Sequence, residues 1–441
     1  MSNRNDLLQK IENRSARIGI IGLGYVGLPL AARAGRVGFS VLGFDVSADK
    51  IASLNAGVSY IGDVASAEVA ELRERDRLEA TSDFARLRDC DIAIICVPTP
   101  LNSTRDPDIS FIERAADDVA RGLHAGQLVI LESTTYPGTT QEVIQPRLES
   151  RGLKVGADVF LAFSPERIDP GQTNIKGYTV ENTPKVIGGV TAACTELAAA
   201  FYGSITSRVV PVSSPRAAEL TKLFENVFRS VNIALVNELA LLCDRMELNV
   251  WEVIDAAATK PFGFMKFTPG PGLGGHCIPV DPFYLTWKAR EFDLTTRFIE
   301  LAGEVNTQMP RHVHELVIRA LNRQRKALNG AHVLLLGVAY KPDVDDYRES
   351  PVFKIMELLA ADGATVVTVD PHVAAFEVHH GRSFQTVPIS DDLLDQADCV
   401  VIITDHSAFD YGRIVARAPA VVDTRNATMG VRAGREKIVL L

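Results

Sequence analysis

A loop rich in glycine and proline near the middle of the chain presents the side chain best suited to nucleophilic chemistry. Residues 270–281 contain four glycines and two prolines, a composition that excludes both helix and regular strand. We expect a tight loop that holds Cys277 where a ligand can approach the backbone, with Asp281 four residues further on. Two interpretations of Cys277 stay open here: a catalytic nucleophile, or a small apolar side chain in a turn.

A lysine and an amide are spaced to act together on a long predicted helix. The helix begins near Pro215 and extends to about Met246. Lys222 and Asn226 lie four residues apart, so they project from one face toward the same point. Such a pair suits a developing oxyanion, and an ordinary surface pair is the alternative. Because the helix is apolar on more than one side, we also expect it to form a subunit interface.

A segment near the N-terminus carries the pattern of a dinucleotide-binding site. A buried-type strand at 17–21 is followed at once by the sequence GLGYVG at 22–27, and a helix begins there. A second strand at 40–44 ends in Asp45, eighteen residues after Gly27. Strand, glycine loop, helix, strand and acid in this order form a strong dinucleotide fingerprint, whereas the glycine pattern alone would be weak.

Each residue of this fingerprint has a physical task. Gly22 makes the turn, Gly24 admits the pyrophosphate, and Gly27 lets helix pack on strand. The backbone N–H groups that start the helix, in the loop that also contains Tyr25 and Val26, face the phosphates. Asp45 would accept hydrogen bonds from the adenosine ribose and repel a 2'-phosphate, which favours NAD over NADP. Lys50 either assists at the ribose or phosphate or is a solvated helix lysine.

Polar residues follow three further predicted strands of this region. Thr99 comes after the strand at 91–97, Thr134 after the strand at 127–132, and Glu166 after a last strand at 158–163. Ligands of doubly wound sheets lie outside the carboxyl ends of the strands. We therefore expect Thr99 and Thr134 near the nicotinamide, although either could be a simple turn or cap residue.

Composition limits the class of protein. The chain has 441 residues, too many for one core, with 46% hydrophobic and 23% charged residues, as in soluble proteins. The net charge of −9 argues against nucleic-acid binding. Six scattered cysteines without a CxxC pattern indicate neither a disulfide framework nor a zinc site, and so favour the cytoplasm. We expect no signal peptide, no membrane-spanning run and no metal, including at His276-Cys277.

The C-terminal part restarts the β/α rhythm. Strands are predicted at residues 331–337, 365–370, 399–404 and 420–423, and the loop 340–351 carries Lys341 and Arg348. We therefore predict an α/β fold with two Rossmann-like, doubly wound parallel-sheet domains joined by a helical middle domain with a long central helix. The expected domains are an NAD-binding domain at 1–212 with a helical appendage at 1–16, a helical dimerisation domain at 213–326, and a second nucleotide-type domain at 327–441, whose basic loop suits another phosphate-bearing ligand.

From about Arg17 to Thr424 the chain resembles the UDP-glucose/GDP-mannose dehydrogenase family, the nucleotide-sugar 6-dehydrogenases. The resemblance rests on the segments 22–27, 133–134, 164–166, 220–226, 274–281, 340–341 and 348–350. It implies NAD as cofactor, a UDP-sugar as substrate, a homodimer or higher homo-oligomer, and oxidation of the sugar C6 alcohol to a carboxylate in two NAD-dependent steps.

The resemblance also implies a role for each site residue. Cys277 would attack the C6 aldehyde, forming a thiohemiacetal and then a thioester that water hydrolyses. Lys222 and Asn226 would stabilise the charge at the C6 oxygen, and Asp281 would orient Lys222 or the water. Glu166 would assist the steps that involve water, with Thr134 positioning it or the nicotinamide. Arg167 and Gly171 would line the UDP pyrophosphate. Gly274 and Lys341 would bind the substrate, and Arg348 would reach the NAD.

The sugar is less tightly defined by the resemblance. Segments 59–61, 133–140 and 259–264 are most similar to enzymes of UDP-N-acetylhexosamines, so UDP-N-acetyl-D-glucosamine is the first choice. UDP-N-acetylmannosamine, UDP-N-acetylgalactosamine and UDP-glucose stay open. Lys260 stands in the region where UDP-glucose enzymes place an arginine from the neighbouring subunit. A single-step hydroxyacid or 6-phosphogluconate-type dehydrogenase, and an NAD-binding regulatory protein, are the competing classes.

Overall fold

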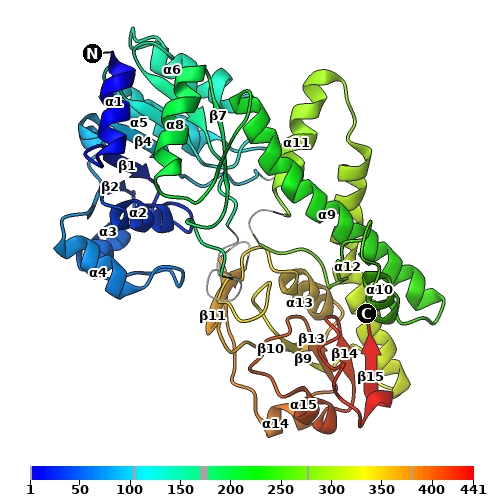
Figure 1. Cartoon of the computed structure of the whole chain (residues 1–441). Helices are drawn as coiled ribbons and strands as arrows, with labels where there is room; N and C mark the ends of the chain where they lie inside the picture. Colours follow the sequence, from blue (N-terminus) through cyan, green and yellow to red (C-terminus); the bar gives the residue numbers. More distant parts are fainter. Residues whose placement is uncertain (1, 103–105, 169–176, 276–277, 379–380) are drawn as a thin grey trace. The chain divides into compact units, whose positions relative to one another are not determined.

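A computed structural model describes residues 2–102, 106–168, 177–275, 278–378 and 381–441 (Figure 1). The chain forms two compact units. Unit 1 comprises Met1–Glu225 and Phe283–Leu294, and unit 2 comprises Asn226–Pro282 and Thr295–Leu441. The division therefore falls inside one long helix, between Glu225 and Asn226.

Unit 1 is built on an eight-stranded sheet in the order β3-β2-β1-β4-β5-β6-β7-β8. All neighbours are parallel except β6 and β7, which are antiparallel. The order up to β6 is that of a dinucleotide-binding sheet, with its switch point between β1 and β4. The strands are β1 (Arg17–Ile21), β2 (Ser40–Phe44), β3 (Leu78–Thr81), β4 (Ile92–Ile95), β5 (Leu128–Leu131), β6 (Phe160–Phe163), β7 (Lys185–Gly189) and β8 (Val209–Pro211).

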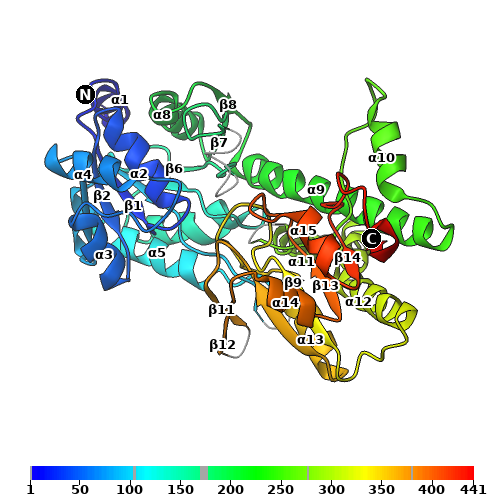
Figure 2. The ribbon, with the colours of Figure 1, turned by 90° about the horizontal axis from the view of Figure 1, so that it is seen from below.

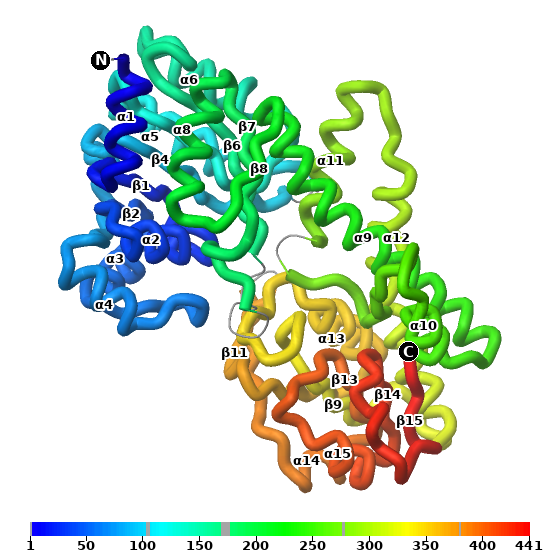
Figure 3. The backbone as a smooth tube through the Cα atoms, in the orientation of Figure 1, coloured from blue at the N-terminus to red at the C-terminus, as the bar shows by residue number. Residues whose placement is uncertain are grey.

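Helices pack around this sheet through buried apolar side chains. The predicted N-terminal appendage is α1, in which Leu7 and Ile11, one turn apart, are buried. It lies beside α8 in both the ribbon and the tube drawing (Figures 1 and 3). Up to residue 212, the helices in the described part of the unit are α1 (Asn3–Glu12), α2 (Gly27–Arg36), α3 (Ala48–Asn55), α4 (Ser66–Glu74), α5 (Ser110–Gly122), α6 (Gln145–Glu149) and α8 (Ala192–Gly203).

The long predicted helix is present as α9 (Pro215–Arg245). In unit 1 its buried Glu219 accepts hydrogen bonds from the backbone N–H groups of Gly138 at 2.6 Å and Thr140 at 2.9 Å. Helix α9 is long and apolar enough to cross a membrane. This is weak evidence for a membrane span, because core helices of soluble proteins have the same length and composition. Its hydrogen-bonded, buried Glu219 and Asn237 mark it as a helix of the protein interior.

The middle of the chain is mostly helical, as predicted. The remaining helices there are α10 (Val250–Ala258), α11 (Asp281–Ala289) and α12 (Arg297–Arg323). The segment 259–280, which contains the glycine-rich loop, has no helix or strand in its described part.

Unit 2 contains a second parallel sheet, in the order β10-β9-β13-β14-β15. Alternate strand residues point to opposite faces: Val333 and Leu335 pack in the cluster with α12 and α13, and Leu334 and Leu336 in the cluster with α14 and α15. Figure 2 shows these helices from below. The elements are β9 (His332–Leu336), α13 (Val352–Ala361), β10 (Thr365–Val369), β11 (Ala375–Val378), β12 (Arg382–Gln385), α14 (Asp391–Gln396), β13 (Cys399–Ile402), α15 (Tyr411–Arg417), β14 (Val421–Asp423) and β15 (Ile438–Leu440).

The predicted fold class is confirmed by two parallel sheets and a long central helix. One detail was wrong: the strand near 158–163 is not the last of its sheet, because β7 and β8 follow it. Strand β3 was also missed. Its sequence LEAT alternates buried and half-buried residues over only four positions, which is too short for a distinct periodic signal.

Candidate active site

The glycine loop of unit 1 has the geometry that the fingerprint predicts. Gly22 has a φ of 94°, and a Cβ there would lie 2.5 Å from the carbonyl oxygen of Cys96. A Cβ on Gly27 would lie 1.9 Å from the Gly22 carbonyl oxygen, so helix α2 could not pack as it does. A Cβ on Gly24 would meet nothing within 4 Å, which leaves open space where the pyrophosphate is expected.

Asp45 at the end of β2 ties the second strand to the glycine loop. One carboxylate oxygen accepts the Leu23 N–H at 3.0 Å, and the other accepts the Ser47 N–H at 2.9 Å. Lys50 extends its ammonium to 3.5 Å from the same carboxylate while remaining 39% exposed. The ammonium thus lies beside the carboxylate expected at the ribose, and its contact with NAD stays a prediction. The hydroxyl of Tyr60 also donates to the Leu23 carbonyl at 2.6 Å, a support that the sequence did not reveal.

Three predicted site residues follow adjacent parallel strands at one edge of the sheet. Thr99 follows β4, Thr134 follows β5 and Glu166 follows β6. Thr99 is buried, and its carbonyl accepts a hydrogen bond at 3.0 Å from the Tyr284 hydroxyl. Thr134 is half-buried. Since neighbouring parallel strands end at the same edge, the sheet brings these residues to the side where the glycine loop lies.

Glu166 lines a cavity of about 180 Å³ together with Tyr25 and Val26 of the glycine loop. Its Oε1 accepts the backbone N–H groups of Arg167 at 2.6 Å and Ile168 at 2.7 Å. Burial pushes the pKa of Glu166 upward, but the Lys185 ammonium and these N–H donors outweigh it and leave the pKa lowered. Glu166 is therefore an ionised acceptor at the cavity wall.

Arg167, next in sequence, is already engaged inside unit 1. Its guanidinium contacts the Glu225 carboxylate at 2.6 Å on α9 and donates to the Pro184 carbonyl at 2.8 Å. It thus fixes the end of β6 to α9. The loop beyond it, including Gly171, lies outside the described residues. The contact of Arg167 and Gly171 with the UDP pyrophosphate stays a prediction.

Helix α9 presents Lys222 and Asn226 as buried groups, with exposures of 9% and 5%. This burial excludes the alternative of an ordinary surface pair. The Asn226 amide donates to the Asp281 carboxylate at 2.5 Å, and Asp281 is only 2% exposed. Within the described ranges, the Lys222 ammonium forms no hydrogen bond or ion pair. A buried lysine without a carboxylate partner is costly unless a ligand or reaction uses it.

The glycine-rich loop of unit 2 packs closely on its own unit. A Cβ on Gly274 would lie 2.4 Å from Cβ of Tyr340, and Gly275 has a φ of 85° with its N–H donating to the Arg348 carbonyl at 2.9 Å. The sequence suggested that these glycines make room for a ligand; Gly274 and Gly275 make room for Tyr340. His276 and Cys277 lie outside the described residues.

The predicted substrate loop, 340–351, lies against this glycine-rich loop within unit 2. The Arg348 guanidinium forms a two-point contact with Asp346, at 2.9 Å and 2.7 Å. The Lys341 ammonium lies 5.2 Å from the centre of the Tyr340 ring. The segment that precedes Cys277 is therefore held by the same loop that carries Lys341 and Arg348.

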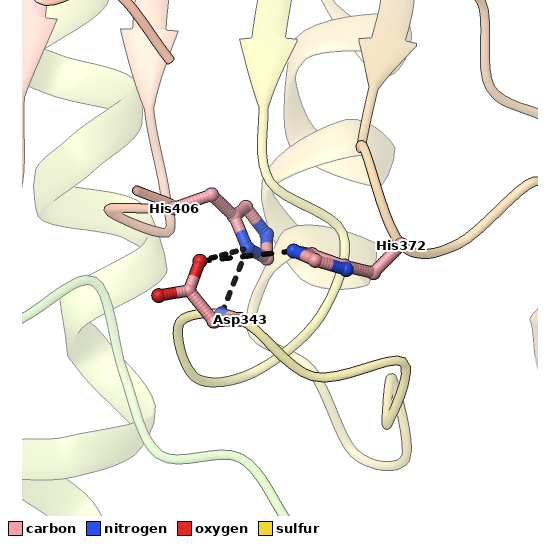
Figure 4. Close-up of side chains that lie close together, drawn as sticks. All are labelled: Asp343, His372 and His406. Atoms are coloured by element: carbon pink, nitrogen blue, oxygen red, sulfur yellow. Dashed lines mark hydrogen bonds and ion pairs between the residues drawn. The ribbon is translucent and has the colours of Figure 1, made fainter. Parts of the chain in front are cut away.

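Asp343, His372 and His406 meet at the carboxyl edge of the unit 2 sheet, and Figure 4 shows their side chains directed toward one another. Their possible ligand atoms lie within 4.8 Å of one another. Nδ1 of His406 accepts the Asp343 N–H at 3.0 Å, however, and Nε2 lies 3.1 Å from the Asp370 carboxylate. Both ring nitrogens thus serve hydrogen bonds that join the strand ends, which favours a structural role over metal binding.

Several residues of the region were missed by sequence reasoning. Glu132, at the end of β5, and Lys185, at the start of β7, form a buried ion-paired group with Glu166. Glu132 directly precedes the Ser133-Thr134 motif, which was a usable signal. No sequence signal pointed to Lys185, because its place beside Glu166 depends on β7 running antiparallel to β6.

Most of the chain matches the family that the motifs suggested. Models of the UDP-glucose/GDP-mannose dehydrogenase family match at residues 16–206 (NAD binding domain), 216–308 (central domain) and 334–429 (UDP binding domain). A UDP-N-acetyl-D-glucosamine 6-dehydrogenase of Pseudomonas aeruginosa is 36% identical over 398 residues, which is 90% of this chain and 92% of the relative. A UDP-N-acetyl-D-mannosamine dehydrogenase of Pyrococcus horikoshii is 37% identical over 395 residues, 89% and 90% of the two chains.

Solved structures agree with these sequence matches. A UDP-D-ManNAc dehydrogenase from Pyrococcus horikoshii superimposes with a TM-score of 0.86 at 34% identity, covering 96% of this chain and 98% of the other. A UDP-glucose dehydrogenase from Pyrobaculum islandicum superimposes with a TM-score of 0.83 at 27% identity, with 96% of each chain covered. The chain therefore belongs to the UDP-glucose/GDP-mannose dehydrogenase family and is an NAD-dependent UDP-sugar 6-dehydrogenase.

Proposed function

We propose that this enzyme oxidises UDP-N-acetyl-D-glucosamine at C6 to UDP-N-acetyl-D-glucosaminuronate, in the cytoplasm, for surface polysaccharide synthesis. The observation that supports this chemistry best is the buried Asn226–Asp281 pair together with the buried Lys222 on the same helix, whose ammonium has no partner in the described part of the chain. Relatives named for this reaction in Pseudomonas aeruginosa and Salmonella typhi are both 36% identical. UDP-N-acetylmannosamine is the second candidate, because a relative named for it is 37% identical.

The fingerprint loop and Asp45 would hold NAD, which supplies the hydride acceptor for both oxidations. Gly24 leaves open space for the pyrophosphate, and Asp45 would accept hydrogen bonds from the ribose while its own hydrogen bonds fix its orientation. Lys50 would add positive charge beside the ribose. Thr99 and Thr134 would line the nicotinamide half, since they follow the next two strands of the same edge.

Lys222 and Asn226 would stabilise negative charge on the C6 oxygen. A lysine amine without a carboxylate partner can accept the alcohol proton in the first oxidation and return one to the oxygen later. The Asn226 amide already donates one N–H to Asp281, which fixes the plane of the amide. Its other N–H is then directed by that contact and can donate to an oxyanion.

Cys277 would add to the C6 aldehyde as its thiolate, forming a C–S bond and a thiohemiacetal whose oxygen Lys222 protonates. Loss of a second hydride and a proton gives a thioester. Water then attacks this thioester, its proton passes to Glu166, and the C–S bond breaks to release the carboxylate and the thiol. The lowered pKa of Glu166 keeps it ionised as an acceptor over the neutral pH range.

Residues of the other sheet domain would bind the UDP part. Lys341, beside the Tyr340 ring, would neutralise a phosphate, and the Gly274 backbone would contact the sugar. Arg167 and Arg348 each hold a carboxylate, Glu225 and Asp346, so their expected contacts to pyrophosphate and NAD would be shared with those partners. The three-domain division at 1–212, 213–326 and 327–441 is part of this proposal.

A panel of UDP-sugars assayed by NADH formation tests the function. UDP-N-acetylglucosamine should give the highest kcat/KM and two NADH per sugar, with a uronate product by mass spectrometry. Preference for UDP-N-acetylmannosamine or UDP-glucose would replace the proposed sugar and leave the mechanism intact. One NADH per sugar with an aldehyde product would contradict the thioester route, and no NADH with any sugar would favour an NAD-binding regulator.

A further inference from the structure

A buried lysine contacts a buried glutamate and a half-buried one at the carboxyl edge of the unit 1 sheet. Glu132 follows β5 and Glu166 follows β6, whereas Lys185 begins β7. Because β7 runs antiparallel to β6, its first residue lies at the edge where β5 and β6 end. The exposures of Glu132 and Lys185 are 1% and 2%, so neither charge is at the surface.

The ammonium of Lys185 is surrounded by oxygen acceptors. It contacts Oε1 of Glu132, lies 2.9 Å from Oε2 of Glu166 and lies 3.3 Å from the Pro165 carbonyl oxygen. The Tyr202 ring centre is 5.2 Å away. An ammonium has three donors, and all three have an acceptor here. The arrangement therefore fixes the lysine, and through it the outer glutamate.

The two carboxylates differ in what they face. Glu132 faces inward, where its Oε2 lies 3.4 Å from the buried Cys96 thiol. Glu166 lines the cavity that it shares with the glycine loop, and its Oε1 also accepts two backbone N–H groups. Burial raises the pKa of Glu132 and the Lys185 ammonium opposes that rise, whereas at Glu166 the same ammonium and the backbone donors outweigh burial and leave the pKa lowered. The inner carboxylate thus balances the lysine, and the outer one is offered to the cavity.

We propose that Lys185 is a positioning residue of this enzyme, which holds the Glu166 carboxylate ionised and aimed at the active-site cavity, with Glu132 as its internal counter-ion. The proposal rests on the proposed role of Glu166 in the water step. Without the cation, two carboxylates would face each other, and one would take up a proton. A protonated Glu166 could neither accept the proton of the attacking water nor keep its present orientation.

Other charged groups near Glu166 are already paired. Arg167 contacts Glu225, and among the residues lining the cavity Arg33 contacts Glu181 and Arg36 contacts Glu68. The titratable groups that complete the surroundings are Cys96 after β4, Tyr202 on α8, and Tyr25 and Asp63 at the cavity. Lys185 is the cation in direct contact with Glu166 among the described residues.

The test compares Lys185→Met, Lys185→Arg and Lys185→Met/Glu132→Gln in the full-length enzyme, with the pH profile of NADH formation as readout. In Lys185→Met the acid limb of kcat should move upward by about one to three pH units, because Glu166 loses its ionisation at higher pH. We expect kcat at neutral pH to fall about 100-fold, with a smaller change in the KM for NAD. Lys185→Arg should restore most activity, and the double variant should return the acid limb toward its original position.

Lys288→Met is the matched control. Lys288 is also buried, with its ammonium 3.0 Å from Glu142 and 2.7 Å from Glu291, away from the Glu166 network. Its loss should lower the melting temperature without moving the pH profile. If Lys185→Met behaves like this control, with a wild-type pH profile, the positioning role is wrong.

A readout that needs no turnover separates this proposal from the proposed function. The carboxyl stretch of Glu166, assigned by infrared difference against Glu166→Gln, should appear at higher pH in Lys185→Met than in wild type. An unchanged titration overturns the Lys185 proposal even if the wild type forms two NADH per sugar. Absence of any turnover in the wild type would overturn the proposed function, while a shifted titration would still support the role of Lys185. If Lys185→Met does not fold, Glu132→Gln carries the measurement: with the second carboxylate removed, Lys185 acts on Glu166 alone, so the Glu166 titration should move to lower pH, and an unaltered titration contradicts the proposal.

Discussion

At the scale of single residues, the central prediction concerns Cys277. Cys277→Ser should lower carboxylate formation by more than about 10³-fold, because loss of a catalytic nucleophile can cost up to ~10⁶-fold in kcat. A slow release of aldehyde or a trapped adduct is the expected remainder. Product analysis by mass spectrometry beside NADH counting measures both. Full conversion to the carboxylate by this variant would show that the thioester is not formed.

Asp45 allows a second test at the same scale. Asp45→Ala removes two backbone hydrogen bonds and the proposed ribose contacts, and a hydrogen bond to a charged group contributes about 1.5–3 kcal/mol. The KM for NAD should rise about 10- to 100-fold, with little change in the KM for the UDP-sugar. Steady-state kinetics with each substrate varied in turn decide this. Equal increases in the KM for NAD and the KM for the UDP-sugar would show that Asp45 does not contact the ribose.

At the scale of elements, the sequence predicted most strands within two or three residues because buried parallel strands are short apolar runs. It predicted α9 almost to the residue, since Pro215 fixes the start. It could not predict that β7 is antiparallel, and so it missed Lys185. It also could not predict that Gly274 and Gly275 accommodate Tyr340, because that contact joins segments far apart in the chain.

Asp370, at the end of β10, gives an element-scale prediction. Its carboxylate accepts N–H groups from Val338, Ala339, His372 and Val373 and contacts His406, joining the ends of β9, β10 and β13. Burial alone would raise the pKa of Asp370, but the His406 contact and the backbone donors lower it to about 2. A lowered pKa stabilises the fold above the unfolded value of 3.8, and this stability is lost as the pH falls through about 2.

Asp370→Asn should therefore destabilise the fold by about 2 kcal/mol near neutral pH, and the difference from wild type should shrink between about pH 4 and pH 2. Urea unfolding followed by circular dichroism at several pH values measures the effect. Asp392→Asn, at an exposed position in the first turn of α14, is the control. If the difference in unfolding free energy between Asp370→Asn and wild type stays constant across this pH range, the lost stability comes from packing and not from the charge of Asp370.

At the scale of the whole molecule, α9 has an exposed stripe of large apolar side chains. The exposed residues are spaced by four, four, seven and seven positions, so they share one face of the helix. They are Leu220, Phe224, Phe228, Leu235 and Leu242, with exposures of 43%, 63%, 41%, 63% and 52%. Five large apolar side chains on one helix face are typical of an oligomer interface, so we propose that this face joins two copies of the chain, as in the homodimer or higher homo-oligomer that the resemblance implies.

Leu235→Glu combined with Leu242→Glu should weaken self-association by about 2 kcal/mol or more, roughly thirty-fold in Kd, because each carboxylate would have to be desolvated in the interface. Sedimentation velocity over a range of concentrations measures the change. Met429→Glu, which alters an exposed apolar residue away from α9 in sequence, should leave the oligomer unchanged. Equal association of both variants would show that another surface forms the oligomer, and a monomeric wild type would contradict the homodimer itself.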